Sequence, residues 1–172
     1  MDFVVNIFAL GIPFSVALLL ASLGEMFNQR AGVFNLGCEG IMAMGAFLGM
    51  LVPYSVGQGG PVSGAYNILG LLLAMGIGAL LGLFFGLVVV TFRAPQGIAG
   101  IGLQMFGVGA AGTLFRHFVG GTQSIPGIDR LPIPVLSEIP VLGPVLFSHN
   151  PLVYMTFLMV PAAWYVLFKT PW

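Results

Sequence analysis

Five long apolar runs, separated by shorter intervals, dominate the pattern of hydrophobic and polar positions along this chain. A helix that crosses the hydrocarbon core of a bilayer needs about 20 apolar residues. Five runs meet that length, at residues 3–23, 36–54, 67–92, 97–118 and 151–168. They are continuously apolar rather than alternating, which favours helices over the strands of a membrane barrel. The pattern predicts an all-α polytopic membrane protein with about five transmembrane helices.

The longest interval between runs, residues 119–150, is rich in both proline and apolar residues. It contains Pro126, Pro132, Pro134, Pro140 and Pro144, and prolines at this density prevent a long helix. Its many leucines, isoleucines and valines argue against a disordered polar linker. We therefore expect a Pro-rich outer loop that packs on the protein or enters the membrane interface, where it is a candidate docking surface for a partner.

Composition strengthens the membrane assignment. The chain is 58% hydrophobic and only 6% charged, whereas a soluble domain averages about 25% charged residues. We expect residues 1–172 to form a single transmembrane domain surrounded by the lipid bilayer. Net charge is zero, so nucleic-acid binding has no electrostatic basis. Basic residues at positions 30, 93 and 169 follow the first, third and fifth runs, and the positive-inside rule places these three ends in the cytoplasm.

Residue groupings typical of enzymes are absent from the sequence. His117 and His149 have no cysteine or carboxylate at a spacing that makes a metal site. A Gly-x-x-x-x-Gly-Lys phosphate-binding loop is also missing. We therefore expect no enzymatic activity, no metal and no cofactor on this chain.

Polar residues close to the apolar runs are the candidates for function, because charges near hydrocarbon are costly. Arg30, Asn35 and Glu39 lie between the first two runs. Asn35 can cap the second helix, and Glu39 can form a structural or gating ion pair with Arg30. Alternatively, Asn35 and Glu39 contact a polar solute along a pathway. Gln104, inside the fourth run, makes an interhelical hydrogen bond or contacts the solute, and Phe106 stacks on a ring or simply packs.

Glycines shape the third and fourth runs. Ala74, Gly78, Gly82 and Gly86 recur every four residues, so they form one stripe on which another helix can pack closely. Direct lining of a pathway is the alternative role for this stripe. The fourth run carries six glycines, which weaken a helix. We expect a broken or bent segment there, of the kind that transporters place beside a binding site.

Three stretches carry a resemblance to a known family. "RAGVFNLGCEGIMAMGAF" at 30–47 and "FRAPQGIAGIGLQMFGVG" at 92–109 resemble the permease subunit of bacterial ABC importers, in the branch for simple sugars and nucleosides. Residues 125–154 resemble the outer loop of the nucleoside-type members. Gln29 stands where family members often have Glu, and Gln104 where an Asn is common. The resemblance covers essentially the whole chain.

The resemblance implies a multi-pass permease of the bacterial cytoplasmic membrane that moves a nucleoside or simple sugar by alternating access. It implies a second permease subunit, cytoplasmic ATPase subunits and an extracytoplasmic solute-binding (lipo)protein as partners. After a segment like 168–172, family members continue into an ATPase-coupling segment and further spans. We therefore expect a truncated, N-terminal portion that cannot couple ATP hydrolysis to transport alone.

Two other functions remain open from the residues. The chain could be an ATP-independent oligomeric channel or secondary transporter, with Glu39, or less suitably Glu25, as a proton-coupling carboxylate. It could also be a non-transporting remnant. The sequence does not identify the solute.

Overall fold

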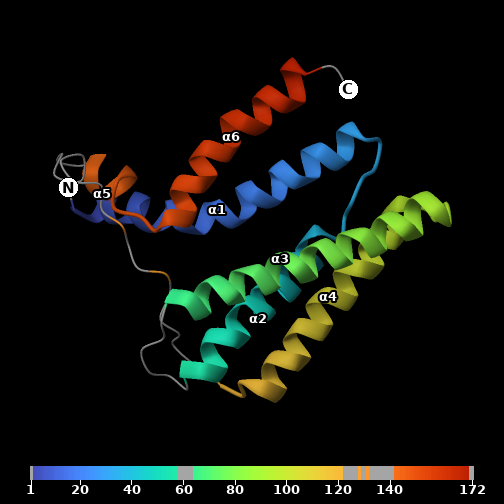
Figure 1. The fold of residues 1–172 in the computed structure, drawn as a ribbon, viewed down its shortest axis with the longest axis horizontal. Helices are drawn as coiled ribbons and strands as arrows, with labels where there is room; N and C mark the ends of the chain where they lie inside the picture. Colours follow the sequence, from blue (N-terminus) through green and yellow to red (C-terminus); the bar gives the residue numbers. More distant parts are fainter. Residues whose placement is uncertain (1, 58–63, 122–127, 129–130, 132–141, 171–172) are drawn as a thin grey trace. The chain divides into compact units, whose positions relative to one another are not determined.

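The computed structural model describes residues 2–57, 64–121, 128, 131 and 142–170, and every regular element among them is helical. The elements, drawn in Figure 1, are α1 (Asp2–Arg30), α2 (Cys38–Gly57), α3 (Gly64–Gly86), the π-helical η1 (Leu87–Thr91) that continues α3, α4 (Gln96–Phe118), α5 (Leu142–Leu146) and α6 (Pro151–Lys169). Five stretches are long and apolar enough to cross a membrane: Ile7–Arg30, Cys38–Gly57, Gly64–Thr91, Gln96–Phe118 and Pro151–Lys169. The predicted fold class is confirmed.

The first helix extends further than its apolar run. α1 continues past residue 23 through a polar last turn to Arg30. There the side-chain amides of Asn28 and Gln29 donate hydrogen bonds to the Glu25 carboxylate, over 3.3 and 3.4 Å. Residues three and four apart lie on one helix face. These side-chain hydrogen bonds therefore stabilise the last turns of α1, which lie beyond the apolar run.

The chain divides into two compact units. The first comprises residues 1–30 and 128–172, and the second residues 31–127. In the first unit, α1 contacts α5 and α6. Asn150 caps α6 by accepting a hydrogen bond from the Val153 N–H over 3.2 Å. Hydrogen bonds also join Tyr154 on α6 to Leu131 and His149, so polar contacts fix the entry into this helix.

In the second unit, α2 packs against both α3 and α4 (Figure 1). α3 runs antiparallel to α2, since Gly49 lies against Gly70 and Gly45 lies against Ala74. α4 runs parallel to α2, and Gly40 lies against Gly107. Glycine at these points lets two backbones approach closely, which stabilises helix pairs in lipid. The core between the three helices is formed by Met44, Phe47, Leu81, Phe85, Val89, Leu103 and Ala111.

Of the two forms expected for the fourth span, broken or bent, the broken one is wrong. α4 is one uninterrupted α-helix from Gln96 to Phe118. Two of its glycines, Gly100 and Gly107, lie directly against α2, so packing offsets the weak helix propensity of glycine. The departure from regular α-helix comes before α4 instead, in η1 and at Arg93, whose φ of 55° lies in the left-handed region.

The Pro-rich outer loop lies mostly outside the described residues. Its described part includes the five-residue helix α5 and the approach to α6 at 147–150. Within this part the imidazole Nε2 of His149 is 2.6 Å from the Val145 carbonyl oxygen. The docking role expected for the loop stays a prediction.

Candidate functional site

The clearest polar feature between helices joins Glu39 on α2 to Gln104 on α4. The Gln104 Nε2 donates a hydrogen bond to Glu39 Oε2 over 2.6 Å. A hydrogen bond to an ionised acceptor is about twice as strong as one between neutral groups. The structure therefore brings together two of the four residues expected along a solute pathway. It also contains the interhelical hydrogen bond that was the alternative role for Gln104.

Asn35 supports the chain just before α2. Its side chain is 5% exposed, and its Oδ1 accepts a hydrogen bond from the Gly37 N–H over 2.8 Å. Because α2 begins at Cys38, this bond holds the approach to the helix. Glu39 follows in the first turn, where the helix dipole favours a negative charge.

Gln96, the first residue of α4, belongs to the same site, and sequence reasoning missed it. Its Oε1 accepts a hydrogen bond from the Phe34 N–H over 2.8 Å, and its Nε2 donates to the Gly32 carbonyl over 3.2 Å. One side-chain amide thus binds two backbone groups that lie two residues apart. The sequence does show a glutamine at the expected start of the fourth helix. It does not show what this glutamine binds, because its partners lie more than 60 residues away in the sequence.

The packing register between α2 and α4 determines how far along α4 this site lies. A Cβ added at Gly37 would lie 2.9 Å from Leu103 Cδ2, and one at Gly40 would lie 2.6 Å from the Leu103 carbonyl. The start of α2 at Cys38 is therefore level with Leu103, seven residues into α4. At 1.5 Å per residue this distance is about 10 Å. Residues 31–37, which are not helical, run beside the first two turns of α4.

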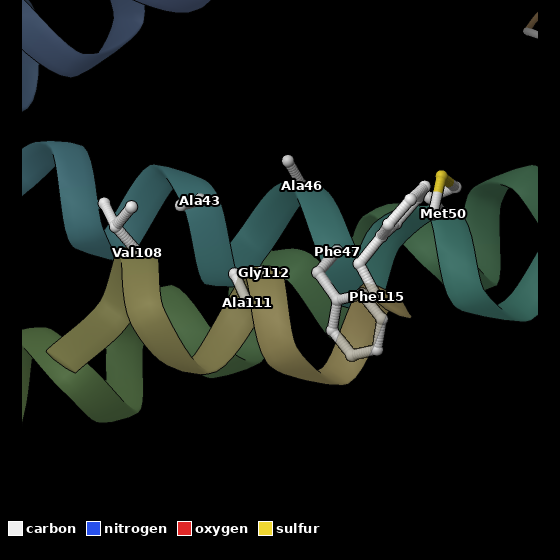
Figure 2. A pocket seen from close by; sticks show the side chains of 8 residues that line it. All are labelled: Ala43, Ala46, Phe47, Met50, Val108, Ala111, Gly112 and Phe115. Atoms are coloured by element: carbon white, nitrogen blue, oxygen red, sulfur yellow. The ribbon is translucent and has the colours of Figure 1, made fainter. Parts of the chain in front are cut away.

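An apolar hollow of about 370 Å³ continues the seam between α2 and α4 beyond the polar pair. Figure 2 shows Phe47, Met50 and Phe115 gathered at one end of it. The remaining lining residues are Ala43, Ala46, Val108, Ala111 and Gly112. This lining is apolar, so the polar groups along the seam are those of Glu39 and Gln104 among the described residues.

The other predicted site residues lie apart from this pair. Phe106 lines a different hollow, of about 240 Å³, together with Phe84 and Phe85 on α3. Arg30 ends α1 in the first unit, so its ion pair with Glu39 stays a prediction. Among the described residues, no group of three His, Cys, Asp or Glu side chains could hold a metal ion.

The small-residue stripe of α3 contacts α2 mainly at Ala74, which lies against Gly45 and Gly49, and its three glycines add only one near contact among the described residues. A Cβ at Gly78 would lie 3.8 Å from Ile41, whereas Cβ atoms at Gly82 and Gly86 would meet no described atom within 4 Å. The close approach of α3 to α2 occurs at Gly70 instead. The packing role of Gly78, Gly82 and Gly86 against other helices stays a prediction.

Apolar helices of membrane length, with a polar pair held between two of them, define a multi-pass protein of the cell membrane. Residues 7–172 match the family described as the permease component of the branched-chain amino acid transport system, and the chain belongs to this family. The resemblance stated from the sequence, to permease subunits of the sugar and nucleoside type, is confirmed by the relatives.

The chain is 35% identical to the guanosine ABC transporter permease protein NupQ of Bacillus subtilis (strain 168), over 98% of the chain and 54% of the relative. It is 31% identical to the nucleoside ABC transporter permease protein NupC of Lactococcus lactis subsp. cremoris, over 91% and 50%. The putative glucose ABC transporter permease protein TsgC13 of Haloferax volcanii is 29% identical, over 99% and 50%. The chain thus spans about half the length of these relatives. No solved structure matches it.

Proposed function

We propose that this chain forms part of the membrane-spanning permease of an ABC importer that moves a nucleoside, or a related simple sugar, into the cell by alternating access. The observation that carries the proposal is the match to nucleoside permeases along nearly the whole chain, at 35% identity to a guanosine permease. ATP hydrolysis is assigned to separate cytoplasmic ATPase subunits. A second permease subunit and an extracytoplasmic binding protein complete the proposed assembly.

In this proposal, Glu39 and Gln104 form the polar contact for the solute. Glu39 is exposed and Gln104 is half-buried, and they lie beside an otherwise apolar seam. A carboxylate accepts hydrogen bonds, and an amide both donates and accepts them. The pair therefore complements the hydroxyl groups of a ribose or sugar and the N–H groups of a base. Asn35 supports this contact by holding the approach to α2, and the part expected for Phe106, which lines a separate hollow, stays a prediction.

The test is uptake of radiolabelled guanosine and glucose by cells that carry the gene for this protein with its neighbouring transport genes, in a host without nucleoside uptake. Uptake that falls when ATP is depleted, and persists when the proton gradient is collapsed by a protonophore, supports the ABC importer. Deletion of the ATPase gene must abolish it.

The competing functions give different results in the same assay. Uptake that survives deletion of the ATPase and stops with the protonophore would identify a secondary transporter, and Glu39→Gln should then remove its pH dependence. Uptake that needs neither source of energy would identify a channel. Complete lack of uptake, with the protein present in the membrane, would favour a remnant without transport activity.

A further inference from the structure

The segment that leads into α2 is unusual because it is not helical and runs beside α4. Residues 31–37 lie alongside the first two turns of that helix, since α2 begins level with Leu103. Gly32, at the start of the segment, has a φ of 80°, a conformation that glycine adopts without steric cost. At membrane depth, irregular backbone is tolerated only where protein groups satisfy its N–H and C=O groups.

The side chain of Gln96 satisfies two of these backbone groups. It binds the Phe34 N–H at 2.8 Å and the Gly32 carbonyl at 3.2 Å. An amide can do this because it carries a donor and an acceptor on one rigid plane. The segment is fixed again where Leu36 lies against Gly100 on α4. Between these contacts, the segment cannot slide along α4 without breaking the amide contacts.

The position of this segment determines where Glu39 lies. Only four residues separate Phe34 from Glu39, and Glu39 is the second residue of α2. If the segment moved along α4 by one helical residue, about 1.5 Å, the 2.6 Å bond from Gln104 would no longer be satisfied in its present geometry.

We infer that Gln96 is a positioning residue, which fixes the depth at which α2 begins and thereby presents Glu39 to Gln104 and to the solute. Gln96 itself contacts neither Glu39 nor the solute in this assignment. The inference rests on the proposed function for its effect on transport, but its structural part can be measured without transport.

Cys38 provides the structural measurement, because it is the first residue of α2 and the only cysteine among these 172 residues. In membranes that contain the whole protein, the rate of its modification by N-ethylmaleimide reports how well water reaches the start of α2, since the thiolate is the reacting form. A Cys38→Ser variant gives the background rate.

Gln96→Met keeps the length of the side chain and removes both hydrogen bonds. We expect the modification rate of Cys38 to rise about tenfold, the change that corresponds to the loss of one or two ordinary hydrogen bonds. We also expect the KM for guanosine to rise by a similar factor with little change in maximal rate. Gln29→Met is the matched control, because the side chain of Gln29 donates a hydrogen bond within α1, to Glu25.

A second variant keeps the test decisive. Gln96→Glu retains the acceptor for Phe34 and loses the donor to Gly32, so a smaller rise of the Cys38 rate is expected, and this variant replaces Gln96→Met if the latter fails to reach the membrane. An unchanged Cys38 rate in the variant that accumulates would overturn the positioning role. Absent guanosine uptake in the wild type, with the Cys38 rates as expected, would overturn only the proposed function.

Discussion

The two units of this chain use different means to hold helices together. In the unit of α2, α3 and α4, backbones approach closely at glycines, as at Gly40 with Gly107 and Gly49 with Gly70. In the other unit, no residue of the apolar α1 span is buried, and polar bonds around His149, Asn150 and Tyr154 organise the entry into α6. Close backbone packing is therefore found in the unit that holds a polar pair between helices. There the helices must be positioned precisely, because the two side chains have to meet.

The largest expected effect comes from filling the close contact between α2 and α4. Gly107→Leu should destabilise the protein by about 3 kcal/mol, because the added side chain would overlap the backbone of Gly40 and a well-packed contact cannot relax easily. Thermal unfolding of the purified protein in detergent measures this loss. Gly109→Leu is the control on the same helix, since a Cβ there meets no described atom within 4 Å. Equal losses of stability in both variants would contradict the view that the contact between Gly107 and Gly40 is special.

The next effect concerns the polar pair of the tightly packed unit. Gln104→Leu removes the donor to Glu39, and an interhelical hydrogen bond in a membrane contributes about 1–2 kcal/mol. We expect a loss of this size in stability and at least tenfold weaker guanosine uptake, since the same groups are proposed to contact the solute. Met105→Leu, at the neighbouring exposed position, should leave both properties unchanged. A stable, fully active Gln104→Leu protein would remove the pair from the pathway.

A smaller effect probes the unit that contains α6. Asn150→Ala removes the side-chain cap on Val153 and should cost about 1 kcal/mol of stability, measured in the same unfolding assay. Asn150→Asp retains a capping oxygen and should restore most of the loss. Guanosine uptake by the Asn150→Ala protein should stay near that of the wild type. A loss of uptake larger than the loss of folded protein would show that the two units are coupled in transport.

The smallest effect has the opposite sign. Gly82→Ala on α3 adds a methyl group where no described atom lies within 4 Å, and alanine is a better helix former than glycine by up to about 1 kcal/mol in water. We expect unchanged or slightly raised stability. A marked loss would mean that the stripe of Gly78, Gly82 and Gly86 packs closely against another helix, as the sequence suggested.

The sequence was sufficient for the spans because the bilayer requires long apolar helices, whatever their partners. It failed for α4, since six glycines were interpreted through helix propensity alone, without the neighbour that two of them contact. Candidate polar residues were recognisable one by one, as with Glu39 and Gln104. Their pairing was not, because they lie 65 positions apart in the sequence and the register of two helices decides which residues meet. Gln96 was missed for the same reason.

If the seam between α2 and α4 is the solute pathway that we propose, the late start of α2 also alters the width of the barrier that a polar solute faces there. α4 has 23 residues and, at 1.5 Å per residue, a length of about 35 Å. Over roughly the first 10 Å, its neighbour on the α2 side is the non-helical segment 31–37, whose backbone groups are bound by Gln96 and Asn35. Hydrogen-bonding groups thus reach nearly a third of the way along α4. Only the remaining part of the seam would then require a conformational change to let a hydrated molecule pass.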